Sequence, residues 1–264
     1  MKKRKINAVP ALLALLVGIC LTAYAGRQLW ETKQIYREGN MVYDGLADLV
    51  KKNAAAGLSA AGSSGETYFP IPGLEIGFEI DFDALAAVNK DTSAWLYSPD
   101  TAIDYPVLKS EDDTYYLTRL PDGTPNANGS LFIDCRNTPD FRDPLTVVYG
   151  HHMKSGRMFG SLEGYKKQEY YGKHPFMYLL TRQENYRIDL LYGCVIDAEI
   201  WRKETFMHAE NIGVFLAYAQ DNTTFESRVN DREGDRIVAL ATCSYEFDDA
   251  RYVVIGILSP LAPL

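Results

Sequence analysis

Residues 237–258 read IVALATCSYEFDDARYVVIGIL. Two apolar runs rich in β-branched residues flank a short polar turn, a pattern that predicts a β-hairpin. Cys243 closes the first run and Arg251 opens the second. If the two runs pair, the thiol and the guanidinium lie at the same end of the sheet. The hairpin therefore sets a potential nucleophile beside a permanent positive charge.

A second apolar run ends in histidine, because residues 147–153 read VVYGHHM and the first histidine is His151. Cysteine attacks as a thiolate, which a neighbouring cation favours. Histidine titrates near neutrality and can protonate a leaving amine. Arginine can donate two hydrogen bonds to a developing oxyanion or to a substrate backbone. Cys243, His151 and Arg251 together predict a site for cysteine acyl transfer.

Each of these residues also has a purely structural interpretation. A cysteine at a strand end is more often buried and inert. A histidine after Gly150 suits a turn, and Arg251 can pair with Asp248 or Asp249. The catalytic hypothesis gains strength only from the three residues as a set, to which the backbone amide following Cys243 adds a further candidate oxyanion donor.

Short apolar runs separated by Pro, Gly, Asn and Asp predict a mainly β fold with some helices, either an antiparallel barrel or a sandwich. The predicted strands are 94–97, 103–108, 129–133, 145–149, 177–180, 186–197, 237–242 and 252–258. A short helix is expected over 81–88. Another is expected within 209–230, between the sixth and seventh strands, where Ile212, Phe215, Leu216 and Ala219 share one face.

The N-terminus carries an uncharged run of 21 residues over 6–26. As a helix, this run spans roughly 30 Å, the thickness of the bilayer hydrocarbon. The basic residues at 2–5 predict a cytoplasmic N-terminus and an exported remainder. The residues AYA at 23–25 suit a signal peptidase, which is the alternative. The length of the run, with Arg27 and Trp30 suited to an interfacial belt, favours an uncleaved anchor.

The net charge of −8 hides an asymmetry along the chain. Leaving out the four N-terminal basic residues reduces 27 basic residues to 23 against 35 acidic ones, a net charge of −12. Nucleic-acid binding needs clustered positive charge, so this class of function is excluded. The acidic surface is a solubility feature.

The chain divides into three predicted parts. Residues 1–26 form a cytoplasmic basic tip and a transmembrane anchor, 27–69 a helical stalk with a flexible linker, and 70–264 one folded domain. Residues 27–52 are expected to be helical, with an apolar stripe that is interrupted near Gly39-Asn40. This loose stripe consists of Trp30, Tyr36, Leu46, Leu49 and Val50.

The four cysteines are Cys20, Cys135, Cys194 and Cys243. No pair has the spacing of a metal site or of a redox Cys-x-x-Cys motif. A disulfide between Cys135 and Cys194 stays open, although both lie in apolar runs and buried free thiols are the simpler interpretation.

These motifs resemble the sortases, and most closely class B. The resemblance rests on Thr242-Cys243 with Arg251 eight residues on. It extends over most of residues 78–258. The further similar segments are IDFDAL at 80–85, WL at 95–96, IDYPV at 103–107, SLFIDCRN at 130–137, YGHHMKSGRMF at 149–159 and YEFDDAR at 245–251.

The resemblance implies a closed sortase-type β-barrel of about eight strands, with a helix in the connection before the seventh strand. It implies that Cys243 is the nucleophile, His151 the general acid/base and Arg251 the donor to the oxyanion or the substrate backbone. It implies no cofactor and no metal. Ala241 departs from the serine that many class B members have there. The remaining histidines, which have no role in the matched motif, are His152, His174 and His208.

The implied activity is that of a membrane-anchored transpeptidase whose catalytic domain lies outside the cell. It would cleave a C-terminal sorting signal after threonine and transfer the surface protein to an amine of a peptidoglycan precursor or of another protein. The signal is expected to be Asn-Pro-x-Thr-Asn-like or Pro-x-Thr-Gly-like. The alternatives are a pilin-polymerising or pilin-anchoring sortase, a hydrolytic cysteine protease and a catalytically silent scaffold.

Overall fold

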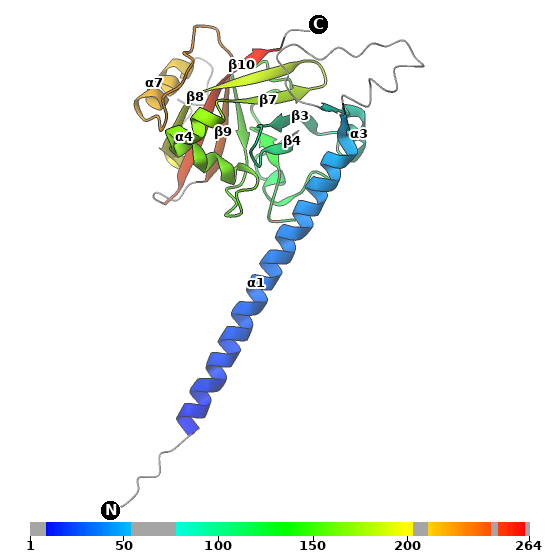
Figure 1. Ribbon diagram of the computed structural model, residues 1–264, viewed down its shortest axis with the longest axis vertical. Helices are drawn as coiled ribbons and strands as arrows, with labels where there is room; N and C mark the ends of the chain where they lie inside the picture. The colour runs from blue at the N-terminus through cyan, green and yellow to red at the C-terminus, as the bar shows by residue number, and fades with distance from the viewer. Residues whose placement is uncertain (1–8, 54–77, 203–210, 244–247, 262–264) are drawn as a thin grey trace, which may run out of the picture.

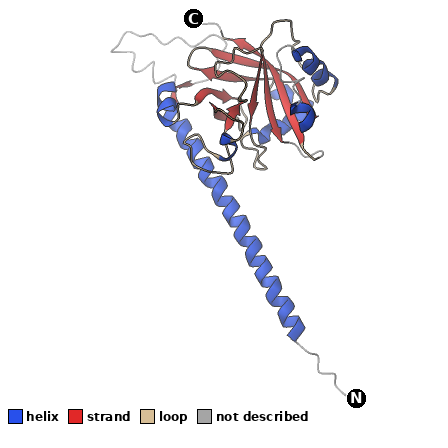
Figure 2. Cartoon of the chain, turned by 180° about the vertical axis from the view of Figure 1, so that it is seen from behind, coloured by secondary structure: helices blue, strands red, loops and turns tan. Residues whose placement is uncertain are grey.

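The computed structural model describes residues 9–53, 78–202, 211–243 and 248–261. Eight strands close into a barrel in the order β10-β8-β7-β3-β4-β5-β6-β9 (Figures 1 and 2). Their bounds are β3 Thr92–Tyr97, β4 Asp104–Lys109, β5 Leu131–Ile133, β6 Leu145–Tyr149, β7 Phe176–Thr181, β8 Asn185–Asp197, β9 Ile237–Cys243 and β10 Ala250–Pro260. The predicted barrel is therefore confirmed, and the alternative of a sandwich is wrong. It is not purely antiparallel, because β4 pairs with β5, and β6 with β9, in parallel.

Successive side chains of β9 point to opposite sides of the barrel wall. Val238 and Leu240 belong to the cluster that fills the barrel interior. Ala239 and Ala241 belong to a second cluster on the outer face of the wall. This alternation decides which side each functional residue faces at the strand ends.

Two helices in the described part of the connection between β8 and β9 contribute to the outer cluster. They are α5 (Ala198–Arg202) and α7 (Ile212–Asp221). Phe215 of α7 is fully buried and packs edge to face on Trp201 of α5, with ring centroids 5.6 Å apart. Because β9 is the seventh barrel strand in chain order, the predicted helix before the seventh strand is confirmed.

The N-terminal helix α1 is continuous from Val9 to Val50 and runs away from the barrel (Figure 1). The predicted helix over 27–52 is confirmed as far as Val50. The interruption of the apolar stripe does not break it, because Gly39 lies within α1 and faces the Asn128 side chain. Leu49 and Trp30 are exposed, so they do not belong to the packed stripe. Helix α1 is long enough and apolar enough to cross a membrane, and its apolar side chains between Leu12 and Trp30 are exposed.

The two residues that border the undescribed segment 54–77 pair with each other. Strand β1 (Lys51–Asn53) runs antiparallel to β2 (Phe78–Ile80), with Asn53 opposite Phe78. The predicted flexible linker lies outside the described residues. The flanking residues Asn53 and Phe78 lie opposite each other, so the end of α1 and the segment that leads into α3 are joined at this sheet. The three-part division of the chain stays a prediction.

Shorter elements complete the fold. Helix α3 (Phe82–Val88) was expected, and Asp81 caps it by accepting hydrogen bonds from the backbone of Asp83 and Ala84 at 3.1 and 3.0 Å. The sequence did not predict η1 (Tyr115–Thr118), η2 (Phe159–Lys166) and α4 (Gln168–Lys173). These pieces are too short and irregular for a periodic pattern.

Removal of the Phe215 ring tests the packing of α7 on the barrel. Phe215→Ala should lower the free energy of unfolding by about 3–5 kcal/mol, because it leaves a cavity against Trp201. The neighbouring Val214 is 53% exposed, and Val214→Ala should change stability by less than about 0.5 kcal/mol. Thermal unfolding followed by circular dichroism measures both. Equal effects of the two substitutions would contradict this account of α7.

Candidate active site

Cys243 and Arg251 lie directly opposite each other at the end of the β9–β10 hairpin. Directly opposed residues have Cβ atoms about 4.5–5.5 Å apart and point to the same face. That face is the outer one, because Ala241 and Val253, two positions along each strand, belong to the outer cluster. Both side chains are half-buried, so the thiol and the guanidinium share a partly solvated position.

His151 reaches the same end of the barrel from β6. In the parallel β6–β9 pair, Tyr149 lies opposite Ala241, and the Gly150 amide donates to the Ala241 carbonyl at 3.2 Å. Counting two residues on along each strand sets His151 level with Cys243. The three predicted residues therefore lie at the ends of three adjacent strands.

The ring of His151 is held by a platform formed by η1 and the 126–130 loop. Its Nε2 lies 2.6 Å from the Leu117 carbonyl oxygen, which can only accept, so Nε2 carries the proton. A Cβ on Gly129 would approach the His151 Cδ2 to 2.8 Å and the Leu117 oxygen to 2.6 Å. Gly129 also has a φ of +57°, a conformation that glycine adopts readily.

Nδ1 of His151 makes no hydrogen bond within the described residues, and the ring is not bonded to the Cys243 thiol there. Donation from Nε2 to Leu117 fixes the tautomer and leaves Nδ1 as the nitrogen available to a reacting group. Catalytic hydrogen bonds are often long before substrate binds. The sequence offered no signal for Leu117, because it acts through its backbone.

His152 contacts the backbone of Cys243. Its Nδ1 donates to the Cys243 carbonyl at 2.9 Å, and its Nε2 lies 3.3 Å from Glu163 of η2. Its side chain is only 6% exposed. His152 therefore fixes the end of β9, whereas the ring of His151 lies against the platform.

A network of polar side chains braces the strands beside the site. The fully buried Asp134 accepts two hydrogen bonds from the Arg136 guanidinium, at 2.8 and 2.6 Å, and one from the Tyr149 hydroxyl at 2.9 Å. Burial opposes ionisation, but these donors outweigh it and lower the pKa of Asp134. The carboxylate therefore stays charged and fixes Tyr149, two residues before His151.

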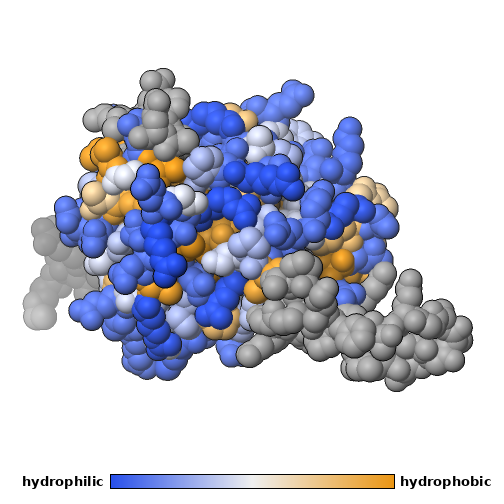
Figure 3. Space-filling model, turned by 90° about the horizontal axis from the view of Figure 1, so that it is seen from above, coloured by the Kyte–Doolittle hydropathy of each residue, from blue (hydrophilic) through white to orange (hydrophobic). Residues whose placement is uncertain are grey.

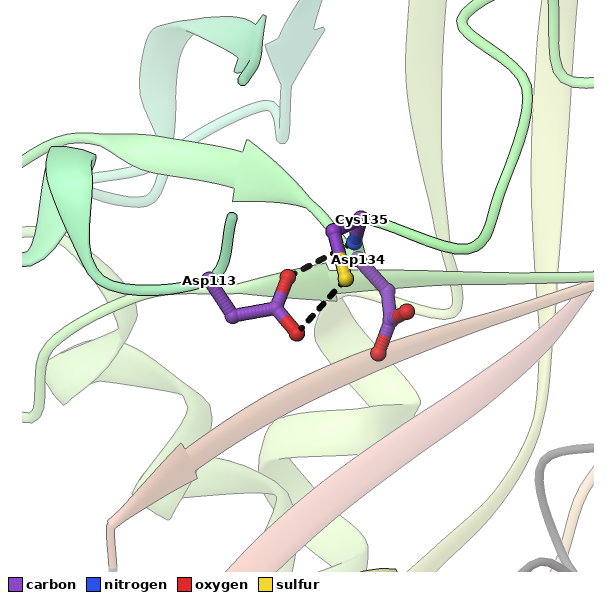
Figure 4. A group of neighbouring side chains, drawn as sticks. All are labelled: Asp113, Asp134 and Cys135. Atoms are coloured by element: carbon purple, nitrogen blue, oxygen red, sulfur yellow. Dashed lines mark hydrogen bonds between the residues drawn. The ribbon is translucent and has the colours of Figure 1, made fainter. Parts of the chain in front are cut away.

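Asp113, Asp134 and Cys135 have a metal-like spacing, with ligand atoms within 4.8 Å of one another (Figure 4). Their atoms are already engaged. Asp113 accepts from the Cys135 amide at 2.6 Å and from its thiol at 3.4 Å, and Asp134 is held by Arg136. We therefore interpret this group as a structural cluster.

The four cysteines differ in environment. All are free, so the alternative of a disulfide between Cys135 and Cys194 is wrong. Burial raises the pKa of the Cys194 thiol to about 12, which confirms it as an inert core residue. Cys135 is exposed, contrary to the buried thiol expected from its apolar neighbours, because the chain turns outward after β5.

The alternative partners proposed for Arg251 are not used in the described part of the chain. Its guanidinium donates to the Ala250 carbonyl at 3.1 Å, and no ion pair there joins it to Asp248 or Asp249. His174 caps the end of α4, where its backbone amide donates to the Tyr170 and Tyr171 carbonyls. His208, the amide after Cys243 and the matched segment Tyr245-Glu246-Phe247 lie outside the described residues.

Known proteins are similar to this chain in sequence and in fold. No family model matches the chain. Sortase B of Listeria monocytogenes is 33% identical over 175 residues, which span 65% of this chain and 71% of that protein. Sortase B of Staphylococcus aureus is 29% identical over 178 residues, 66% of this chain and 73% of that protein.

Solved structures agree with the sequence matches. A Bacillus anthracis protein similar to sortase B superposes with a TM-score of 0.67 at 27% identity, covering 85% of this chain and 97% of that one. The S. aureus sortase B crystal structure gives 0.62 at 27% identity, covering 69% and 87%. An eight-stranded barrel with a thiol, an imidazole and a guanidinium at one end defines the sortase class of cysteine transpeptidases. The chain belongs to the sortase family and is most similar to class B.

The reactivity of Cys135 can be tested by alkylation. Partial desolvation, the hydrogen bond to Asp113 and its negative charge raise the pKa of Cys135. The thiol therefore stays protonated to higher pH, and Cys135 should alkylate slowly at neutral pH and faster as the pH rises. Asp113→Asn lowers this pKa, so alkylation at pH 8 should become severalfold faster.

Iodoacetamide labelling followed by peptide mass spectrometry measures the rate at Cys135 separately from that at Cys243. Glu111→Gln is the matched control, because it removes an exposed charge two residues before Asp113 that makes no hydrogen bond to Cys135. An equal acceleration in both variants would show that general charge, and not the Asp113 contact, governs this thiol.

Proposed function

We propose that this sortase cleaves a C-terminal sorting signal after threonine and transfers the carried protein to an amine of the cell wall. The observation that carries the proposal is the β9–β10 register, which sets Arg251 opposite Cys243. The level position of His151 supports it. A related sortase B has been solved in complex with triglycine, a peptide with a free amine, which supports an amine acceptor here.

In the proposed reaction, the Cys243 thiolate attacks the threonine carbonyl and forms a C–S bond. Arg251 stabilises the oxyanion of the tetrahedral intermediate. His151 gives a proton to the departing amine as the amide bond breaks, which leaves a thioester on Cys243. The acceptor amine then attacks this thioester, loses a proton to His151 and releases the thiolate. The net change is the exchange of one amide for another.

We further propose that α1 anchors the enzyme in the cell membrane with its N-terminus in the cytoplasm. Every residue from Leu12 to Trp30 is exposed, which suits a lipid environment. The basic residues at 2–5 support the orientation. The barrel face remote from the N-terminal end of α1 is largely hydrophilic, as a face turned to water would be (Figure 3). The partners are then surface proteins that bear a sorting signal.

The full-length chain in detergent, incubated with sorting-signal peptides with and without triglycine, tests the reaction. The panel contains Asn-Pro-x-Thr-Asn and Pro-x-Thr-Gly sequences. Intact-mass spectrometry should show a peptide adduct on Cys243 that moves to the amine. Cys243→Ala and His151→Ala should abolish both steps. Arg251→Lys keeps the charge but loses the planar fork, and kcat should fall about a hundredfold.

The remaining outcomes separate the alternatives. Transfer to a pilin lysine in place of triglycine would favour a pilin sortase, and peptide release that ignores the amine would favour a hydrolytic protease. An adduct that persists in Cys243→Ala would overturn the assignment of the nucleophile. If Cys243 resists alkylation and no peptide adduct forms, the interpretation as a catalytically silent scaffold would be favoured.

A further inference from the structure

The C-terminal third of α1 packs on the barrel along one face. Gly39 lies on this face, and a Cβ there would collide with the Asn128 side-chain amide and come within 3.2 Å of the Asn126 Oδ1. Asn128 is 1% exposed, so it has little room to move aside. The glycine that interrupts the apolar stripe is therefore a contact point between the helix and the 126–130 loop.

Hydrogen bonds fix the same contact. The Asn126 side chain donates to the Ile35 carbonyl at 3.0 Å, and Asn128 donates to that of Tyr36 at 3.5 Å. Within the loop, the Gly129 amide donates to the Asn126 carbonyl at 3.1 Å. Backbone carbonyls of α1 thus hold the 126–130 loop in place by accepting hydrogen bonds from two of its side chains.

Tyr43 of α1 reaches Gly129 itself. Its buried hydroxyl donates to the Gly129 carbonyl and lies 3.2 Å from the Ser130 Oγ. Burial raises the pKa of Tyr43, so the hydroxyl stays protonated and keeps its donor. Its ring also meets Tyr105 edge to face, with centroids 5.1 Å apart. A membrane-side helix therefore holds the residue that touches the His151 ring.

We infer that α1 is a positioning element for catalysis: Gly39 and Tyr43 set the 126–130 loop, and Gly129 of that loop holds the His151 ring. This inference rests on the proposed role of His151. The chain of contacts has three links, from α1 to the loop, from Gly129 to the imidazole, and from the imidazole to the Leu117 carbonyl. Displacing the first link should move a group that must be placed within a fraction of an ångström.

Gly39→Ala in the full-length chain tests the inference against a matched control. Gly45 lies in the same helix, and a Cβ added there would meet nothing within 4 Å. Both substitutions improve helix propensity equally, but only Gly39→Ala pushes on Asn128. With the peptide that the wild type cleaves, kcat should fall roughly ten- to hundredfold for Gly39→Ala, with KM unchanged. Gly45→Ala should match the wild type.

Tyr43→Phe supplies a second variant, which removes one oxygen and keeps the ring in its core. Its kcat should fall in the same way, while thermal unfolding shows that the barrel is folded. The pH–rate profile of Cys243 alkylation by iodoacetamide should shift in Tyr43→Phe and Gly39→Ala, because the neighbouring imidazole has moved. A change of stability alone would not shift this profile.

The outcomes distinguish the inference from the proposed function. Wild-type kcat and an unchanged alkylation profile in both variants would overturn the positioning role of α1, even if the wild type transfers peptides normally. If the wild type cleaves no peptide, the proposed function fails, but the alkylation profile still decides whether α1 governs the surroundings of Cys243. An equal loss in Gly39→Ala and Gly45→Ala would also overturn the inference, because a Cβ at Gly45 would touch nothing.

Discussion

Parallel pairing of β6 with β9 aligns Tyr149 with Ala241, and the geometry of the site depends on this register. The two strands are far apart in the chain, so no local turn sets their alignment. Alternation of inner and outer side chains sets it instead, because a slip of one residue would exchange every core side chain for an outer one. The same register brings His151 level with Cys243 at the strand ends.

The adjacent residues His151 and His152 make different contacts at the end of β9. His152 ties the Cys243 backbone to η2 through Glu163, and the ring of His151 lies on the platform of η1 and the 126–130 loop. Neighbouring residues in an extended chain point to opposite sides, which allows one dipeptide to serve both purposes. His151 is half-buried and lies level with Cys243, whereas the side chain of His152 is buried.

The sequence predicted the features that depend on local pattern. All eight barrel strands lie within two residues of their expected bounds, because each is an apolar run ended by turn residues. The pairing of Cys243 with Arg251 was also foreseen, since a short hairpin permits few registers.

The docking of α1 was not foreseen. Gly39 only interrupts the apolar stripe in the sequence, and its partner in the structure, Asn128, is a residue that no periodicity connects to it. The sequence also did not predict the platform under the His151 ring. Its contacts use backbone carbonyls and one glycine at positive φ, which leave no side-chain pattern in the sequence.

The continuity of α1 has a mechanical consequence. A flexible tether would let the barrel turn freely above whatever surface holds the apolar part of the helix. Here the same unbroken helix carries the exposed apolar residues at one end and the docking face at the other, and the strand that follows it pairs with β2. An α-helix transmits tilt along its length because each turn is bonded to the next. Any restraint on Leu12–Trp30 is therefore a restraint on the direction in which the end of β9 faces. For the function proposed above, such a restraint would limit the directions from which a substrate peptide and an acceptor amine can approach Cys243.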